Sequence, residues 1–155
     1  MNSGDELEHN LFQEREPTDV VFDTLWVTHS EFWLVLAAAG HFVDVSTAIP
    51  SEDSIVGNGD AVGIPTRESG VDVRISLSVW PTTPPDGKGA PLGSTSIEVE
   101  GRELRLVNVE GREPGPVLLL EEDGPHLVRV WRSEPGSGRQ KEFYDIRVWR
   151  DPTSC

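Results

Sequence analysis

Residues 71–80 read VDVRISLSVW, and their strict alternation of apolar and polar side chains limits the fold more than any other feature. In an extended chain the apolar members lie on one face: Val71, Val73, Ile75, Leu77 and Val79. In a helix the same five side chains would be spread around the axis. The pattern therefore predicts a strand that has one face in a core and the other face toward water.

Similar short segments, rich in β-branched and aromatic residues, recur between polar or Gly-containing breaks. They cover residues 19–27, 31–37, 41–47, 94–99, 102–109 and 116–120. The pentapeptide VEGRE occurs at 99–103 and again at 109–113, and each copy contains a Glu-Gly-Arg turn. We therefore expect the three strands around these turns to form a meander.

Two Gly- and Pro-rich stretches, 50–70 and 81–93, are expected to be loops, the first with room for one hairpin at Asn58-Gly59-Asp60. About eight to nine short strands then make an all-β chain. A two-sheet antiparallel β-sandwich is the expected fold, because a single meander would leave its apolar face uncovered; a β-barrel is the alternative.

With 155 residues the chain fits one domain, expected at 19–151 and preceded by an acidic segment at 1–18. Ser3 and Glu6 have the spacing of a capping box, which predicts a short helix over 3–16; a frayed acidic tail is the alternative.

The tetrapeptide Arg-Val-Trp-Arg occurs twice, at 129–132 and 147–150, in two segments that are predicted to pair as the last hairpin. A register with Arg129 opposite Asp145 separates an apolar face from an amphipathic one, and it places the two copies at opposite ends. The amphipathic face either binds a partner or packs beneath a loop or the second sheet. Its candidate contact residues are Trp131, Trp149, Arg129 and Arg147.

Net charge is the main clue to function. The chain has 27 acidic and 13 basic residues, a formal charge of −14, although residues 126–155 alone carry +2. This excess repels phosphate backbones and anionic lipid, so we expect no direct nucleic-acid binding and no membrane binding. A basic protein partner is compatible with it, and the predicted exposed turn Glu121, Glu122 and Asp123 is a candidate contact.

The cellular compartment is predicted from the absence of membrane-spanning, secretory and disulfide-forming features in the sequence. No apolar run approaches the length of a membrane span, and the first residues have no secretory signal pattern. Cys155 is the single cysteine, so no intramolecular disulfide can form. We expect a cytoplasmic protein.

No catalytic motif is recognisable. His29, and His41 with Asp44, are the residues closest to a catalytic arrangement, but no nucleophile motif accompanies them. The polar side chains of the 50–60 segment fail the spacing of a calcium loop and match turn chemistry: Glu52, Asp53, Asn58 and Asp60. We expect neither enzymatic activity nor a cofactor or metal.

Residues 115–152, in the C-terminal third of the chain, resemble a segment of uncharacterised actinobacterial β-sandwich proteins and, more distantly, of the competence protein J-like family. A Gly-Pro step, an Arg-Val strand and a closing Trp carry the resemblance: Gly124, Pro125, Arg129, Val130 and Trp149. Arg150 stands where proline is expected. The resemblance implies a bacterial, non-enzymatic β-sandwich, some of whose relatives inhibit a nuclease by binding it.

Three classes of function remain. The first is a non-enzymatic acidic binding module, an inhibitor or immunity-type protein that acts on a basic protein partner. The second is a small ligand-binding or enzymatic β-domain with a loop-built site. The third is a structural or assembly protein that pairs through an edge strand. The charge, the lack of a catalytic motif and the resemblance favour the first.

Overall fold

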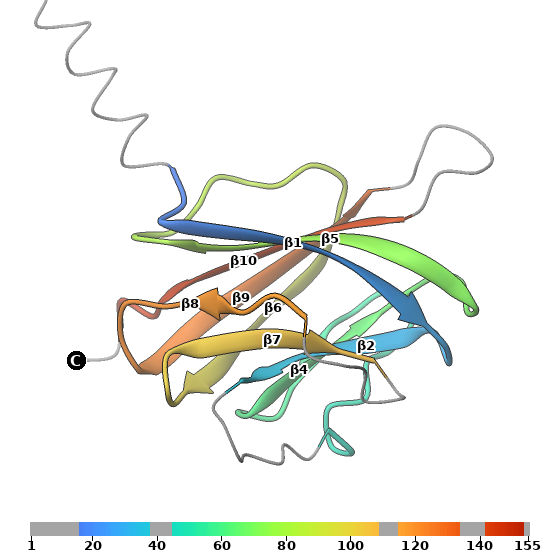
Figure 1. Cartoon of the computed structure of the whole chain (residues 1–155), viewed down its shortest axis with the longest axis horizontal. Helices are drawn as coiled ribbons and strands as arrows, with labels where there is room; N and C mark the ends of the chain where they lie inside the picture. Colours follow the sequence, from blue (N-terminus) through green and yellow to red (C-terminus); the bar gives the residue numbers. More distant parts are fainter. Residues whose placement is uncertain (1–15, 38–44, 109–114, 134–141, 154–155) are drawn as a thin grey trace, which may run out of the picture.

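The computed structural model describes residues 16–37, 45–108, 115–133 and 142–153, which form two five-stranded sheets (Figure 1). Sheet A has the order β1 (Asp19–Val27), β5 (Val71–Trp80), β10 (Phe143–Arg150), β9 (Gly124–Ser133) and β6 (Ala90–Val99). Sheet B has the order β3 (Val56–Gly57), β4 (Ala61–Pro65), β2 (Glu31–Leu36), β7 (Glu103–Val107) and β8 (Leu118–Leu119).

The predicted all-β fold with two sheets is confirmed, and the sheets do not close into a barrel. Within the described residues there is no helix, and so none that could span a membrane. The predicted helix at 3–16 falls outside the described residues, apart from Glu16. One pairing departs from the antiparallel expectation, because β10 runs parallel to β5.

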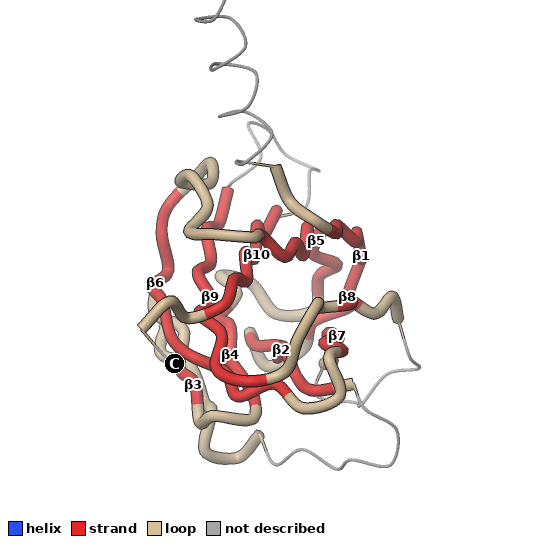
Figure 2. Tube along the Cα trace, turned by 90° about the vertical axis from the view of Figure 1, so that its left-hand side faces the viewer, coloured by secondary structure: helices blue, strands red, loops and turns tan. Residues whose placement is uncertain are grey.

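Sheets A and B face each other across one apolar core (Figure 2). The predicted apolar face of β5 is the core face, since Val73, Ile75 and Leu77 are at most 1% exposed. Phe32 of sheet B meets Tyr144 of sheet A edge to face, with ring centroids 5.3 Å apart. The period-two pattern therefore predicted which side chains fill the interior.

The turn after β6 carries the chain from one sheet to the other. β6 pairs with β9 in sheet A, whereas β7 pairs with β2 and β8 in sheet B, so the predicted three-strand meander is wrong at its first step. Gly101 and Arg102 both have positive φ, 83° and 57°, in this turn. Turn residues predict a reversal of the chain, but they do not specify which sheet receives the next strand.

The 81–93 segment is not a loop throughout, because β6 begins at Ala90. Pro91 lies in this strand opposite Trp131, and the register shifts between Pro91 and Gly93. An edge strand with a bulge tolerates proline, since the missing N–H need not join a ladder. The second predicted loop, 50–70, does contain the expected hairpin, formed by β3 and β4.

The 45–50 segment covers the outer face of sheet B. Residues 41–44 fall outside the described residues, and residues 45–47 are a turn instead of the predicted strand. The indole N–H of Trp33 donates to the carbonyl oxygen of Ala48 at 2.9 Å. A Cβ on Gly63 would lie 2.0 Å from that same oxygen, so this close approach requires glycine.

Candidate partner-binding site

In the last hairpin the two Arg-Val-Trp-Arg copies meet at their first residues. Arg129 lies directly opposite Arg147, and Trp131 lies opposite Asp145. The register therefore differs by two residues from the predicted one, which keeps every side chain on its predicted face. The predicted Arg129–Asp145 pair is wrong, whereas the two copies still run from Arg129 and Arg147 toward opposite ends of the hairpin.

Five side chains on the outer face of sheet A form what we call the Arg–Trp cluster: Trp80, Arg129, Trp131, Arg147 and Trp149. The Cζ atom of Arg147 lies 5.0 Å from the ring centroid of Trp80 and 5.3 Å from that of Trp131. The Cζ atom of Arg129 lies 6.0 Å from the ring centroid of Trp131 and 5.7 Å from that of Trp149. Each guanidinium thus contacts two indoles, a geometry that supports cation–π attraction.

Asp145 pairs with Arg147 at the centre of this cluster. Its carboxylate accepts hydrogen bonds from Arg147 Nε, at 3.1 and 3.3 Å, and from Nη2 at 2.9 Å. The remaining Nη1 donates to the carbonyl oxygen of Pro85 at 2.7 Å. Bidentate pairing of this kind holds a guanidinium in a fixed orientation.

The 81–89 loop crosses above the outer face of sheet A (Figure 1). It contacts Arg147 and Trp131 of the Arg–Trp cluster. A Cβ on Gly87 would lie 2.8 Å from the Trp131 ring, so the loop backbone rests on the indole. Trp131 and Trp149 are only 3% and 2% exposed. Of the two situations expected for this face, the structure shows the indoles packed, with a loop over Trp131. Partner binding by these four residues stays a prediction.

A second predicted contact, the turn of residues 121–123, lies at one end of the sandwich. We call this end the acidic end, because it carries five exposed carboxylates: Glu98, Glu100, Glu121, Glu122 and Asp123. Strand pairing places Glu98 beside Pro125, at the start of β9. The turn after β6 then meets the 121–123 turn, because the Asp123 carboxylate accepts from the backbone N–H of Arg102 at 2.8 Å.

The five carboxylates of the acidic end have different surroundings. Glu122 pairs with Arg150 at 2.7 Å, and Asp123 is bound to the backbone of Arg102. Glu98, Glu100 and Glu121 have no ion pair within the described residues. Two carboxylates therefore hold the turn in place, and three keep an unbalanced negative charge at the surface.

His126 lies behind the acidic end and is 2% exposed. Its Nδ1 atom lies 2.9 Å from the carbonyl oxygen of Gly124, which fits the tautomer with hydrogen on Nδ1. Burial lowers the pKa of His126, against the hydrogen bond to Gly124 that raises it. The ring is therefore held neutral near neutral pH.

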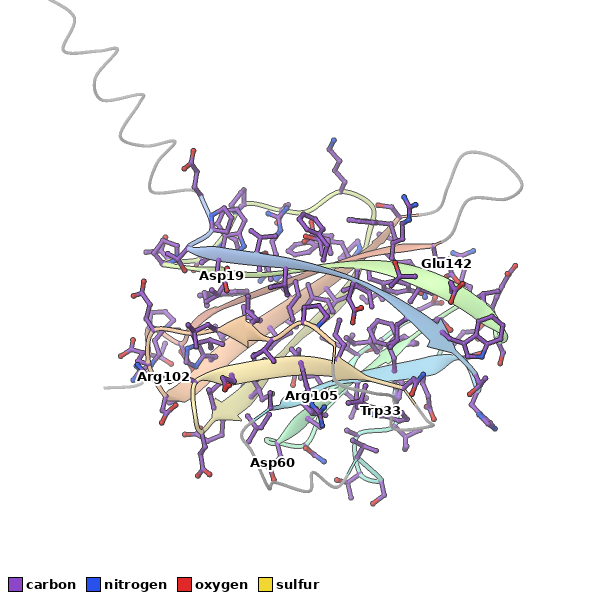
Figure 3. All side chains as sticks on the ribbon, in the orientation of Figure 1. Asp19, Trp33, Asp60, Arg102, Arg105 and Glu142 are labelled. Carbon is purple, nitrogen blue, oxygen red and sulfur yellow. The ribbon has the colours of Figure 1, made fainter. Side chains whose placement is uncertain are left out.

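The opposite end of the sandwich carries a buried polar cluster that was not predicted from the sequence. In Figure 3, Glu142 marks this end and Arg102 marks the acidic end. Arg132 is 3% exposed, and its Nη2 donates to Asp53 at 2.8 Å. Glu142 accepts from the Tyr144 hydroxyl at 3.0 Å. Burial raises the pKa of Tyr144, so it stays neutral and remains a donor.

The signal for this buried cluster is present in the sequence. Arg132 follows Val128 and Val130 at the same alternating positions, so it falls on the core face of β9. A charged residue at such a position needs a hydrogen-bonded or ionic partner. Asp53, far away in sequence, supplies it, although its own carboxylate is exposed.

β1 is an edge strand with two aromatic side chains in solvent, Phe22 at 70% and Trp26 at 49% exposed. The backbone N–H groups of Val20 and Thr24 donate to the side chains of Asp19 and Asp23, at 3.0 and 2.9 Å. Donors bonded in this way are not free for an added strand, so they protect the edge against pairing.

Of the residues considered for catalysis, His29 alone lies in the described part of the chain. His29 is exposed in the turn before β2 with φ 63°, while His41 and Asp44 fall outside the described residues. The Asn58 side chain accepts the N–H groups of Asp60 and Ala61, which is the expected turn chemistry. Among the described residues, no group of three or more His, Cys, Asp or Glu could hold a metal ion.

By its fold, the chain is a two-sheet β-sandwich protein. No protein-family model and no curated protein sequence matches the chain. Two solved structures share the fold. One is ComJ, inhibitor of the DNA degrading activity of NucA, from Bacillus subtilis, with a TM-score of 0.63 at 10% identity over 84% of this chain and 96% of that one.

The second structure is the product of crocagin biosynthetic gene J, with a TM-score of 0.59 at 12% identity over 86% of this chain and 97% of that one. The predicted likeness to the competence protein J-like family is therefore confirmed at the level of the fold. At such identities the similarity carries no residue of either protein over to this chain.

Proposed function

We propose that this chain is a non-enzymatic, inhibitor-type protein of the bacterial cytoplasm that binds a basic protein partner through its acidic end. The observation that carries the proposal is the group of exposed carboxylates without an internal cation, Glu98, Glu100 and Glu121, at one end of the fold. Such groups are available to cations of a partner and attract them over long range.

The construction of the acidic end supports the same function. Asp123 and Glu122 fix the turn through bonds to Arg102 and Arg150, so a partner would meet a surface already in its binding shape. Binding to such a surface costs little conformational entropy. The fold shared with ComJ, whose name describes an inhibitor, supports an inhibitor-type role without identifying a partner.

The test uses two triple variants with the same change in net charge. The first replaces the free carboxylates of the acidic end: Glu98→Gln, Glu100→Gln and Glu121→Gln. The control replaces three exposed carboxylates elsewhere: Glu52→Gln, Asp60→Asn and Glu68→Gln. A basic protein captured from source-cell extract by the wild-type chain is purified, and its dissociation constant is measured against each variant.

We expect the acidic-end variant to bind at least about 10-fold more weakly and the control to change by less than about 2-fold, because close charge pairs at an interface are worth more than net charge alone. Equal weakening in both variants would leave only a general charge effect. Unchanged binding in both would contradict the acidic end as the contact.

A further inference from the structure

A partly open hollow lies beside the acidic end, between the start of β1, the end of β5 and the 121–122 turn. Glu121, Glu122, His126 and Arg150 form its polar lining, and Trp80 and Pro81 contribute apolar surface. Its volume is about 50 Å³, whereas one water needs roughly 10–15 Å³. The space fits a group of a few heavy atoms.

The charges at the hollow favour a cation. Arg150 is the cation in the lining, and Glu122 pairs with it at 2.7 Å. Glu121 has no ion pair within the described residues, so its charge is left over. An anionic group would meet this carboxylate, while an ammonium or guanidinium group would neutralise it.

His126 gives an observation that does not depend on the carboxylates. With hydrogen on Nδ1 toward Gly124, the Nε2 atom carries a lone pair. Within the described residues Nε2 has no hydrogen-bond partner, and it is not a fully enclosed atom although His126 is only 2% exposed and lines the hollow. An acceptor that opens into the hollow is available to a donor that enters it.

We propose that this hollow receives one lysine or arginine side chain of the protein partner, whose N–H groups donate to Glu121 and to His126 Nε2. The inference rests on the proposed function, and it adds the chemistry of the central contact. A basic side chain in a pocket that desolvates it is a typical anchor of a protein interface.

The experiment needs no partner. N-acetyl-arginine methylamide and N-acetyl-lysine methylamide are titrated into the full chain while NMR follows the imidazole signals of His126. N-acetyl-glutamine methylamide serves as the uncharged probe. Three variants are compared with the wild type: Glu121→Gln, Arg150→Gln and, as a control at an exposed turn elsewhere, Asp60→Asn.

We expect saturable shifts at His126 with the basic probes and none with the uncharged one. Glu121→Gln should weaken binding at least about 3-fold, because one ion pair is lost. Arg150→Gln should strengthen it, since Glu122 is then free for the probe. Asp60→Asn should bind as the wild type does. If Glu121 and Arg150 only supported the fold, their two variants would not change the affinity for the probe in opposite directions.

Lowering the pH until His126 becomes protonated should also weaken probe binding, because the imidazolium can no longer accept a hydrogen bond. Arg150, Glu122 and Glu98 are the charged groups that act on His126, and the arginine opposes protonation while the glutamates favour it. Thermal unfolding of each variant at the working pH shows whether the fold is intact.

An absence of saturable shifts at His126 in the folded wild type would overturn the inference, and so would equal affinity in wild type and Glu121→Gln. If the probes bind but the acidic-end triple variant still binds a purified basic partner normally, the hollow is real and the proposed function fails. If that partner requires the acidic end and no probe binds, only the hollow is refuted.

Discussion

The charge state of His126 near neutral pH depends on folding. Because burial lowers its pKa, the unfolded chain takes up a proton near pH 6.5 while the folded chain stays neutral until a lower pH. The unfolded state therefore binds more protons in this window, and the free energy of unfolding falls as the pH drops below 6.5.

We expect the wild type to lose stability as the pH falls below 6.5, and His126→Gln to lose less over the same range, because glutamine does not titrate. Urea unfolding at several pH values measures this difference. His29→Gln is the control, since His29 is exposed, and its pH dependence should match the wild type. If the free energy of unfolding fell with pH as steeply in His126→Gln as in the wild type, the pH dependence could not be assigned to His126.

Ile75 and Ser76 test the face assignment of β5 at two neighbouring positions. Ile75 is 1% exposed in the core, whereas Ser76 lies on the outer face of sheet A. Ile75→Ala should reduce the free energy of unfolding by about 2–4 kcal/mol, and Ser76→Ala should change it by less than about 0.5 kcal/mol. Chemical denaturation measures both. A larger loss from the serine variant would reverse the two faces.

Among the elements, the β9–β10 hairpin shows what alternation can and cannot predict. The pattern assigned every side chain of the hairpin to the correct face, because a shift of two residues preserves the faces. It could not select between registers, since each sorts apolar from polar residues equally well. Arg147 opposite Arg129 looks unfavourable in sequence, and Asp145 together with the carbonyl oxygen of Pro85 makes it acceptable.

A pair of aromatic substitutions tests whether the Arg–Trp cluster is packed. Trp131 is 3% exposed under the 81–89 loop, while Phe22 is 70% exposed on β1. Trp131→Ala should cost about 3–5 kcal/mol of stability, and Phe22→Ala less than about 0.5 kcal/mol. Thermal and urea unfolding measure both. Should Trp131→Ala leave stability unchanged, the indole would have to be regarded as a surface group available for a partner.

Sheet membership was less predictable than strand position. The sequence predicted β1, β2, β5 and the last hairpin, yet it placed β6 in a meander with β7. Pairing of β6 with β9 is a contact between distant parts of the chain, and no local turn signal encodes it. The same limit explains why Asp53 was not recognised as the partner of Arg132.

For the molecule as a whole, the net charge indicated a basic protein partner, and the fold indicated which surface could bind it. The 121–123 turn was identified from sequence, because three acidic residues in a row are visible without a structure. Glu98 and Glu100 were not, since only the β6–β9 pairing brings them to the same end. The acidic end is thus a product of the tertiary structure.

The most direct test of the central claim is the association rate with the purified basic partner as a function of salt, measured by stopped flow. Screening should lower the rate for the wild type as salt rises. The slope should flatten in the triple variant Glu98→Gln, Glu100→Gln and Glu121→Gln, and it should stay nearly unchanged in the control at Glu52, Asp60 and Glu68. A rate that is indifferent to salt, or equal slopes in all three proteins, would contradict binding through the acidic end.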